Sequence, residues 1–176
     1  MSGTLTLALA GNPNAGKTSI FNALTGSRHH VGNWPGKTVA KMEGTFRHGG
    51  IVGRLVDLPG TYSLSALSPE EIITRDYLLT GEADAVIDVV DSTNLERNLY
   101  LTAQLAELGI PLVLALNISD SARSKGIRID NERLSVLFGR APVVETVGHR
   151  AQGLDELMDA ALGLVDPARA QLRLIA

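Results

Sequence analysis

Apolar residues along this chain fall in short unbroken runs that alternate with stretches of helical periodicity. The apolar runs predict strands over residues 4–10, 39–47, 51–57, 85–90, 111–116 and 141–145. The helical periodicity predicts helices over residues 17–26, 70–80, 95–108, 131–138 and 154–165. Fully apolar strands that alternate with helices are typical of a mostly parallel sheet covered on both faces. We therefore expect an α/β fold with six strands and with helices on both faces of the sheet.

The segments between these elements carry turn-forming residues. His48, Gly49 and Gly50 separate two strand-like runs and predict a hairpin, so one strand of the sheet should be antiparallel. Residues 27–38 and 58–69 show no periodicity and are expected to be loops.

Composition limits the classes of function. The 176 residues, 44% of them hydrophobic, suit one domain over 1–166, followed by a tail or linker start over 167–176. The net charge of −3 without a Lys/Arg run gives no reason to expect a nucleic-acid partner. The absence of cysteine excludes disulfides and thiolate chemistry. The longest apolar stretch, 110–118, is roughly half of a membrane helix, so we expect a soluble domain.

A phosphate-binding loop follows the first predicted strand. Residues 11–18 read GNPNAGKT and match G-x-x-x-x-G-K-[ST] between a strand and a helix. Such a loop turns its amide groups toward phosphate oxygens, which needs glycine at Gly11 and Gly16. Lys17 is expected to reach the β- and γ-phosphates, and the Thr18 hydroxyl to bind Mg²⁺. The candidate phosphate-binding residues are Gly11, Asn12, Pro13, Asn14, Ala15, Gly16, Lys17, Thr18 and Ser19.

Two further motifs follow the ends of predicted strands. Asp57 and Gly60 form an Asp-x-x-Gly in which the carboxylate can hold Mg²⁺ and the glycine amide can sense a γ-phosphate. Asn117 and Asp120 form an Asn-x-x-Asp. The Asp120 carboxylate can accept from the N1–H and 2-amino group that guanine presents, whereas the alternative is an ordinary helix cap. Ligands of such sheets lie outside the carboxyl ends of the strands, where all three motifs fall.

The loop before the second predicted strand holds two residues of interest. Thr38 either coordinates Mg²⁺ when a γ-phosphate is present, which makes the loop a switch, or is a solvated loop residue. Trp34, the single tryptophan, is either a core residue or an exposed functional ring.

With these residues in place, the chain resembles the G domain of the FeoB family of bacterial ferrous-iron transporters, from its first strand to about residue 165. The resemblance is carried by GNPNAGKT (11–18), VGNWPGKTV (31–39), DLPGTYSL (57–64), SPEE (68–71) and DSTNLERNLYL (91–101). It implies a Ras-like, TrmE-Era-like P-loop GTPase whose cofactors are GTP or GDP, Mg²⁺ and K⁺.

The resemblance also implies roles for single residues. The side chain of Asn14 and the backbone carbonyls of Gly32 and Trp34 would hold K⁺, Thr38 would be the switch I threonine, and Lys17, Gly60, Thr38 and Asn14 would serve catalysis. Thr61 stands where small GTPases carry a glutamine, so water positioning must come from elsewhere. The last guanine loop reads Thr146-Val147-Gly148-His149 instead of Ser-Ala. The guanine-contacting N–H is expected from Gly148 or a neighbour such as Val147.

The function implied is a slowly hydrolysing GTP switch, stimulated by K⁺, that regulates Fe²⁺ transport across the bacterial inner membrane from its cytoplasmic face. The partners implied are the helical and membrane-spanning parts of the same full-length transporter, and whether the domain forms a homo-oligomer stays open. One alternative is a TrmE-Era-like GTPase of ribosome assembly or tRNA modification, against which the lack of a basic patch counts. Another is a P-loop ATPase or kinase, against which Asp120 counts.

Overall fold

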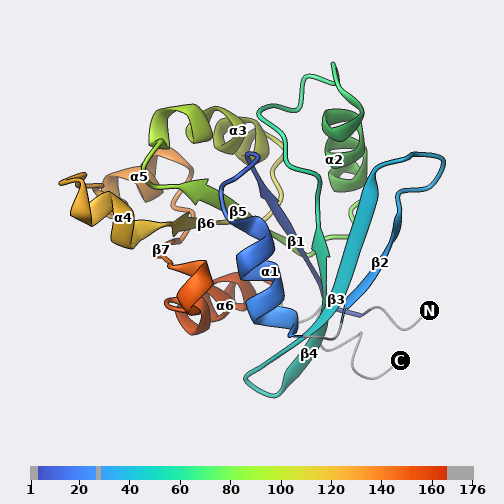
Figure 1. The fold of residues 1–176 in the computed structure, drawn as a ribbon, viewed down its shortest axis with the longest axis horizontal. Helices are drawn as coiled ribbons and strands as arrows, with labels where there is room; N and C mark the ends of the chain where they lie inside the picture. The colour runs from blue at the N-terminus through green and yellow to red at the C-terminus, as the bar shows by residue number, and fades with distance from the viewer. Residues whose placement is uncertain (1–3, 27–28, 166–176) are drawn as a thin grey trace.

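A computed structural model describes residues 4–26 and 29–165 as one α/β unit built on a seven-stranded sheet (Figure 1). The strand order is β2-β3-β4-β1-β5-β6-β7. The strands are β1 Thr6–Gly11, β2 His29–Asn33, β3 Ala40–His48, β4 Ile51–Asp57, β5 Ala85–Asp91, β6 Leu112–Asn117 and β7 Val143–Glu145. The helices are α1 Lys17–Thr25, α2 Pro69–Leu79, α3 Leu95–Glu107, α4 Ser119–Ser124, α5 Asn131–Leu137 and α6 Leu154–Gly163, with a short 3₁₀ turn η1 at Gly148–Arg150.

The predicted fold class is confirmed, but the predicted count of six strands is wrong. Strand β2 lies in the segment expected to be a loop, and it pairs antiparallel with β3 through Val31 and Met42. Its side chains are mostly exposed, so no alternation of apolar and polar residues marks it. Strand β3 is antiparallel to both β2 and β4, whereas the other described pairings are parallel. A single strand direction is therefore reversed, as expected.

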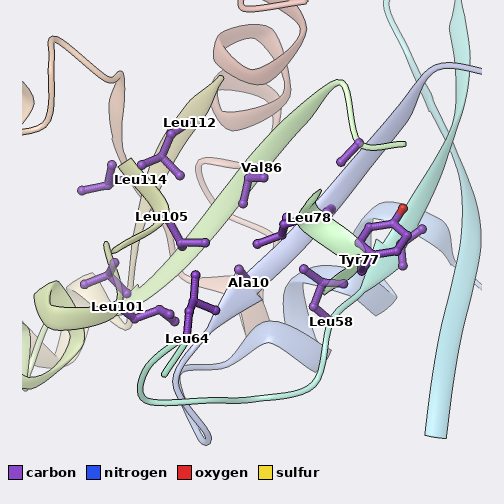
Figure 2. Packing of buried hydrophobic residues seen from close by; sticks show 14 of the residues in the cluster. Ala10, Leu58, Leu64, Tyr77, Leu78, Val86, Leu101, Leu105, Leu112 and Leu114 are labelled. Atoms are coloured by element: carbon purple, nitrogen blue, oxygen red, sulfur yellow. The ribbon is translucent and has the colours of Figure 1, made fainter. Parts of the chain in front are cut away.

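The core lies on both faces of the sheet because the central strands bury every side chain. In β1, Leu7 and Leu9 pack with α1 and α6, while Ala8 and Ala10 pack on the opposite face with α2, α3 and α5. Figure 2 shows this second cluster, in which Leu101 and Leu105 of α3 and Leu78 of α2 meet strand residues such as Val86. Burial on both faces explains the unbroken apolar runs of the sequence.

Helix α2 begins at a sharply specified residue. The Ser68 hydroxyl accepts from the Glu71 amide at 3.2 Å, and the Glu71 carboxylate accepts from the Ser68 amide at 3.3 Å. Pro69 occupies the first helical position, where its missing N–H costs nothing. This capping box fixes where the long connection after β4 must end.

The sheet brings the carboxyl ends of its parallel strands to one edge. The register pairs Leu9 with Asp57, Gly11 with Val89, and Asp91 with Asn117. The first two motifs therefore begin on adjacent strands, β1 and β4, and the third begins at the same edge on β6, beyond β5. Within the described ranges, no helix combines the length and apolar character needed to cross a bilayer. The predicted tail or linker, 167–176, lies outside the described residues.

Candidate nucleotide site

The loop between β1 and α1 encloses a cavity of about 480 Å³ at the carboxyl edge of the sheet. Its lining residues are Asn12, Pro13, Asn14, Gly16, Lys17, Thr18, Ser19 and Gly60. All but Gly60 come from the predicted phosphate loop, and Gly60 comes from the Asp-x-x-Gly. The two motifs, separated along the sequence, are thus walls of one cavity.

Backbone conformation explains the residue types in this loop. Gly16 has a φ of 93°, and a Cβ there would collide with the Asn117 amide nitrogen. Asn14 has a φ of 66°, a left-handed conformation that asparagine tolerates better than most residues. Gly16 is therefore required both by its conformation and by the close approach of the strand β6 terminus.

Lys17 and Asp57 form an ion pair at the floor of the site. The Lys17 Nζ donates to Asp57 Oδ1 at 2.9 Å, and both side chains are about 10% exposed. Burial raises the pKa of Asp57 and outweighs the opposing effect of the Lys17 ammonium. The Asp57 carboxylate holds Lys17 beside the cavity, and the ammonium can exchange this partner for a phosphate oxygen.

Asn117 joins three segments of the chain. Its Nδ2 donates to the Ala15 carbonyl at 2.9 Å, and its Oδ1 accepts from the Gly148 amide at 2.9 Å and from the Thr146 hydroxyl at 3.1 Å. The side chain is buried, as is Val147, which pairs with Gln152. The phosphate loop, the end of β6 and the loop after β7 are therefore held in one arrangement.

Asp120 offers an acceptor that the described residues leave unused. Its Oδ1 is buried with no hydrogen-bond partner, and its Oδ2 lies 3.7 Å from Arg150 Nη1. An unsatisfied buried carboxylate oxygen costs free energy until a donor reaches it. The arrangement suits a ligand edge carrying N–H groups, as guanine does.

Ile118, between these two residues, has a strained backbone. Its φ of 61° is a left-handed value that β-branched residues adopt rarely. The local geometry is imposed by Asn117 and by the start of α4, so the strain is tolerated at the site.

Replacing Ile118 by methionine should stabilise the protein, because an unbranched side chain fits a positive φ with less strain. We expect a gain of about 1 kcal/mol and a rise in Tm of about 2–4 °C in thermal unfolding. Ile129→Met is the matched control, since Ile129 is also partly buried but has no positive φ. An unchanged or lower Tm for Ile118→Met would contradict the strain assignment.

The structure does not bring Gly32, Trp34 or Thr38 to the phosphate cavity. Thr38 is exposed, Gly32 lies in the β2–β3 ladder, and none of Gly32, Trp34 and Thr38 is among the cavity-lining residues. The Trp34 carbonyl accepts from the Lys37 amide at 2.9 Å. The prediction that Gly32 and Trp34 join Asn14 in a K⁺ site stays a prediction, as does the role of Thr38.

The Trp34 ring is a core residue in this structure, which decides between the two interpretations of the sequence for this state. It is 6% exposed and packs edge-on against Tyr77 of α2, with ring centroids 5.4 Å apart. Lys41 lies over its face at 4.8 Å. The loop that carries Trp34 and Thr38 is thereby anchored on α2.

Two residues beside the site, Tyr62 and Arg97, were given no role from the sequence. The Asn12 Nδ2 donates to the Arg97 carbonyl at 3.4 Å, and the Arg97 guanidinium lies 4.2 Å from the centre of the Tyr62 ring. Both residues lie in stretches that carry the family resemblance, DLPGTYSL and DSTNLERNLYL. No local pattern could have paired them, because their contact depends on how the chain folds.

Comparison with known proteins identifies the family to which this chain is similar. The profile of the family described as "Ferrous iron transport protein B" matches residues 5–161. The Fe(2+) transporter FeoB of Escherichia coli K12 is 52% identical over 157 residues, which cover 87% of this chain and 20% of that protein. This chain therefore spans about a fifth of that relative's length.

Two solved structures are similar over most of this chain. The G domain of T. maritima FeoB is 46% identical with a TM-score of 0.84, covering 91% of this chain and 98% of that one. A GDP-bound variant of the S. thermophilus FeoB G domain is 47% identical with a TM-score of 0.86, covering 92% of this chain and 61% of that one.

Proposed function

This chain belongs to the FeoB family of ferrous iron transport proteins and corresponds to its G domain, and we propose from this that it binds GTP and GDP and slowly hydrolyses GTP. One observation carries the nucleotide assignment. Asn117 ties the phosphate loop to the loop after β7, and next to it the buried Asp120 Oδ1 has no donor among the described residues. A ligand with phosphates at one end and N–H donors at the other satisfies both ends of the site. The GDP bound to the similar S. thermophilus domain supports the same choice.

The residues of the cavity divide the chemistry among them. The amides of the loop after Gly11 and the first turn of α1 would hold the phosphates, and Lys17 would leave Asp57 for the β- and γ-oxygens. The Gly60 amide would face the γ-phosphate, because Gly60 packs against Pro13 at the cavity wall. The last guanine contact would come from an amide next to Gly148, whose own N–H is bonded to Asn117.

Two cations complete the proposal. Thr18 and Asp57 present the hard oxygen atoms that Mg²⁺ prefers, and Thr38 would join them once switch I moves. Asn14 is exposed at the cavity, so its amide oxygen is free to meet K⁺ together with the Gly32 and Trp34 carbonyls. These cations would supply positive charge where it develops on the transferred phosphoryl group.

GTP hydrolysis should be faster in K⁺ than in Na⁺, and Asn14→Ala should remove that difference. We expect a stimulation of roughly tenfold, because the smaller Na⁺ would not fill a site formed for K⁺ and its preorganised positive charge would be lost. GTP and ATP turnover, each measured in both salts, tests the base and the cation together. Asn22→Ala, on the exposed side of α1, is the control that should keep the K⁺ response. Equal rates in both salts for the unmodified protein would count against the Asn14 assignment.

In the full-length protein we assign this domain to the regulation of Fe²⁺ passage across the bacterial inner membrane. Residues 1–166 would form the G domain on the cytoplasmic side, and 167–176 would begin the linker to a helical part and the membrane-spanning part. The length of the relatives supports further parts beyond this chain. An uptake assay with the whole transporter carrying Asp120→Asn tests this role, since regulation by GTP requires Fe²⁺ uptake to change.

A further inference from the structure

In the segment after Asp57, the Thr61 side chain is bonded within the chain. Thr61 stands at the position of the glutamine of small GTPases, and it is 3% exposed. Its amide donates to the Gly11 carbonyl at 3.2 Å, and its hydroxyl donates to the Ser63 carbonyl at 2.7 Å. The backbone next to Gly60 is thus bonded to the phosphate loop, but the Thr61 hydroxyl is committed to a local turn, so a side-chain contribution must come from a neighbouring residue.

Tyr62, the next residue, is contacted by Arg97 of helix α3. Its side chain is 42% exposed on one side, and the Arg97 guanidinium covers the ring at 4.2 Å from its centre. A guanidinium stacked on an aromatic face is attracted by the ring and stiffens both side chains. Tyr62 is thereby fixed two residues beyond Gly60.

Arg97 is well placed to act as such a support, because the first turn of α3 is itself rigidly attached. The buried Asn98 side chain accepts from the Asp91 amide at 3.1 Å and donates to the Asn94 carbonyl at 2.8 Å. The Arg97 carbonyl also accepts from Asn12 of the phosphate loop at 3.4 Å. One residue of α3 therefore contacts both the phosphate loop and the segment that carries Gly60.

The far half of the same connection is fixed independently. The Glu71 carboxylate accepts from the hydroxyl of Ser63 at 2.5 Å and from the amides of Leu67 and Ser68 at 2.8 and 3.3 Å. These contacts secure residues 63–68 to the start of α2, but they do not reach Gly60. In the near half, 57–62, the Leu58 amide donates to the Leu9 carbonyl at 2.9 Å and the Thr74 hydroxyl donates to the Pro59 carbonyl at 3.3 Å, while the Tyr62 side chain is held by Arg97.

We propose that Arg97 is a positioning residue for GTP hydrolysis, which holds Gly60 over the γ-phosphate position by stacking on Tyr62. This inference rests on the proposed GTPase function. It assigns Arg97 no contact with the nucleotide: the guanidinium acts through Tyr62, and the carbonyl acts through Asn12. Its removal should affect the rate of the chemical step more than the affinity for nucleotide.

The test compares kcat and KM for GTP in K⁺ with the Kd for GDP across variants of the two residues. Arg97→Ala should lower kcat by roughly three- to tenfold while the GDP Kd changes less than about twofold. Arg97→Lys should recover part of kcat, because an ammonium keeps the cation over the ring but not the planar stack. Tyr62→Phe should behave as the unmodified protein, and Tyr62→Ala as Arg97→Ala. The double variant should lose no more than either single variant.

Two controls separate this role from general stability. Tyr100→Ala removes an exposed tyrosine from the same helix, and Arg133→Ala removes an exposed arginine from α5; both should keep kcat. The Arg97 carbonyl persists in every variant, so its contact with Asn12 is not altered. An unchanged kcat in a folded Arg97→Ala protein, or losses that multiply in the double variant, would overturn the inference.

A further measurement keeps the inference independent of the proposed function. If the unmodified protein hydrolyses no GTP above the buffer rate, the proposed function fails, and amide hydrogen exchange over 57–62 decides the positioning role. Faster amide exchange over 57–62 in Arg97→Ala supports the positioning role of the Arg97–Tyr62 stack, and equal exchange refutes it.

Discussion

Asp120→Asn should abolish the preference of this protein for guanine nucleotides. The Asp120 carboxylate would accept from two N–H groups of guanine, whereas an asparagine presents a donor on one side and meets the 2-amino group or N1–H with like polarity. Losing two charge-assisted hydrogen bonds and burying a mismatched donor should weaken GDP binding about 100-fold or more. ATP binding, which never uses this carboxylate, should change little. Displacement of a labelled guanine nucleotide from the protein by GDP, GTP or ATP measures the affinity for each of them.

The matched control is Asp155→Asn. Asp155 lies on α6 with its side chain 94% exposed, so the same chemical change there should leave nucleotide affinity as it was. An Asp120→Asn protein that kept its preference for GTP over ATP would refute the guanine assignment. Retained affinity for phosphate-bearing ligands would leave the phosphate loop assignment intact.

Asp88→Asn should make the protein more stable at neutral and alkaline pH. Asp88 is 1% exposed in the central strand β5, where it accepts from the Thr102 hydroxyl at 2.5 Å. Burial raises the pKa of Asp88 to about 7, and the Thr102 hydroxyl only partly opposes this. The folded protein therefore keeps this proton up to about pH 7, whereas the unfolded chain loses it near its ordinary value of 3.8.

The direction of the pH effect follows from that difference. Between these two pKa values the folded state holds the proton and the unfolded state does not, so the free energy of unfolding falls as the pH rises and levels off above about 7. The loss amounts to about 4 kcal/mol at most. Asparagine, a neutral isostere that still accepts from Thr102, should remove this slope.

Urea unfolding at pH 5 and pH 8 measures the effect. The unmodified protein should lose stability between the two values, and Asp88→Asn should lose clearly less. Asp76→Asn, at an exposed position of α2 beside Arg75, serves as the control that should keep the original pH dependence. A similar pH dependence in Asp88→Asn would show that the buried carboxyl does not cause it.

The sequence was sufficient for the parallel core and for the edge of the sheet where the site lies. Apolar runs such as 85–90 and 112–116 are buried on both faces of the sheet. Lys17 follows β1 and Asp57 ends β4, two strands that are adjacent in the sheet, whereas Asn117 ends β6, which β5 separates from β1. Because these strands all end at one edge of the sheet, the predicted strands were enough to place the three residues in one region. The ion pair of Lys17 with Asp57 and the bond from Asn117 to Ala15 follow from this placement.

Other features escaped because no local signal carries them. Strand β2 reads His29-His30-Val31-Gly32-Asn33 and is held by its ladder with β3 rather than by burial. Helix α4 has only six residues, which are mostly polar, so it has no apolar stripe to reveal it. The stack of Arg97 on Tyr62 joins two segments far apart in the sequence, and only the tertiary fold brings them together.

The burial of Trp34 gives the protein an optical signal of its own. Trp34 is the only tryptophan in the chain, and its buried ring lies between the Tyr77 ring and the Lys41 ammonium. The Trp34 carbonyl accepts from the Lys37 amide at 2.9 Å, and the ring is buried against Tyr77 of α2. If residues 32–38 move to the phosphates and the ring leaves this contact for water, the emission of this single fluorophore should shift to longer wavelength. The fluorescence spectrum of the unlabelled protein should therefore report whether the loop that carries Trp34 has moved.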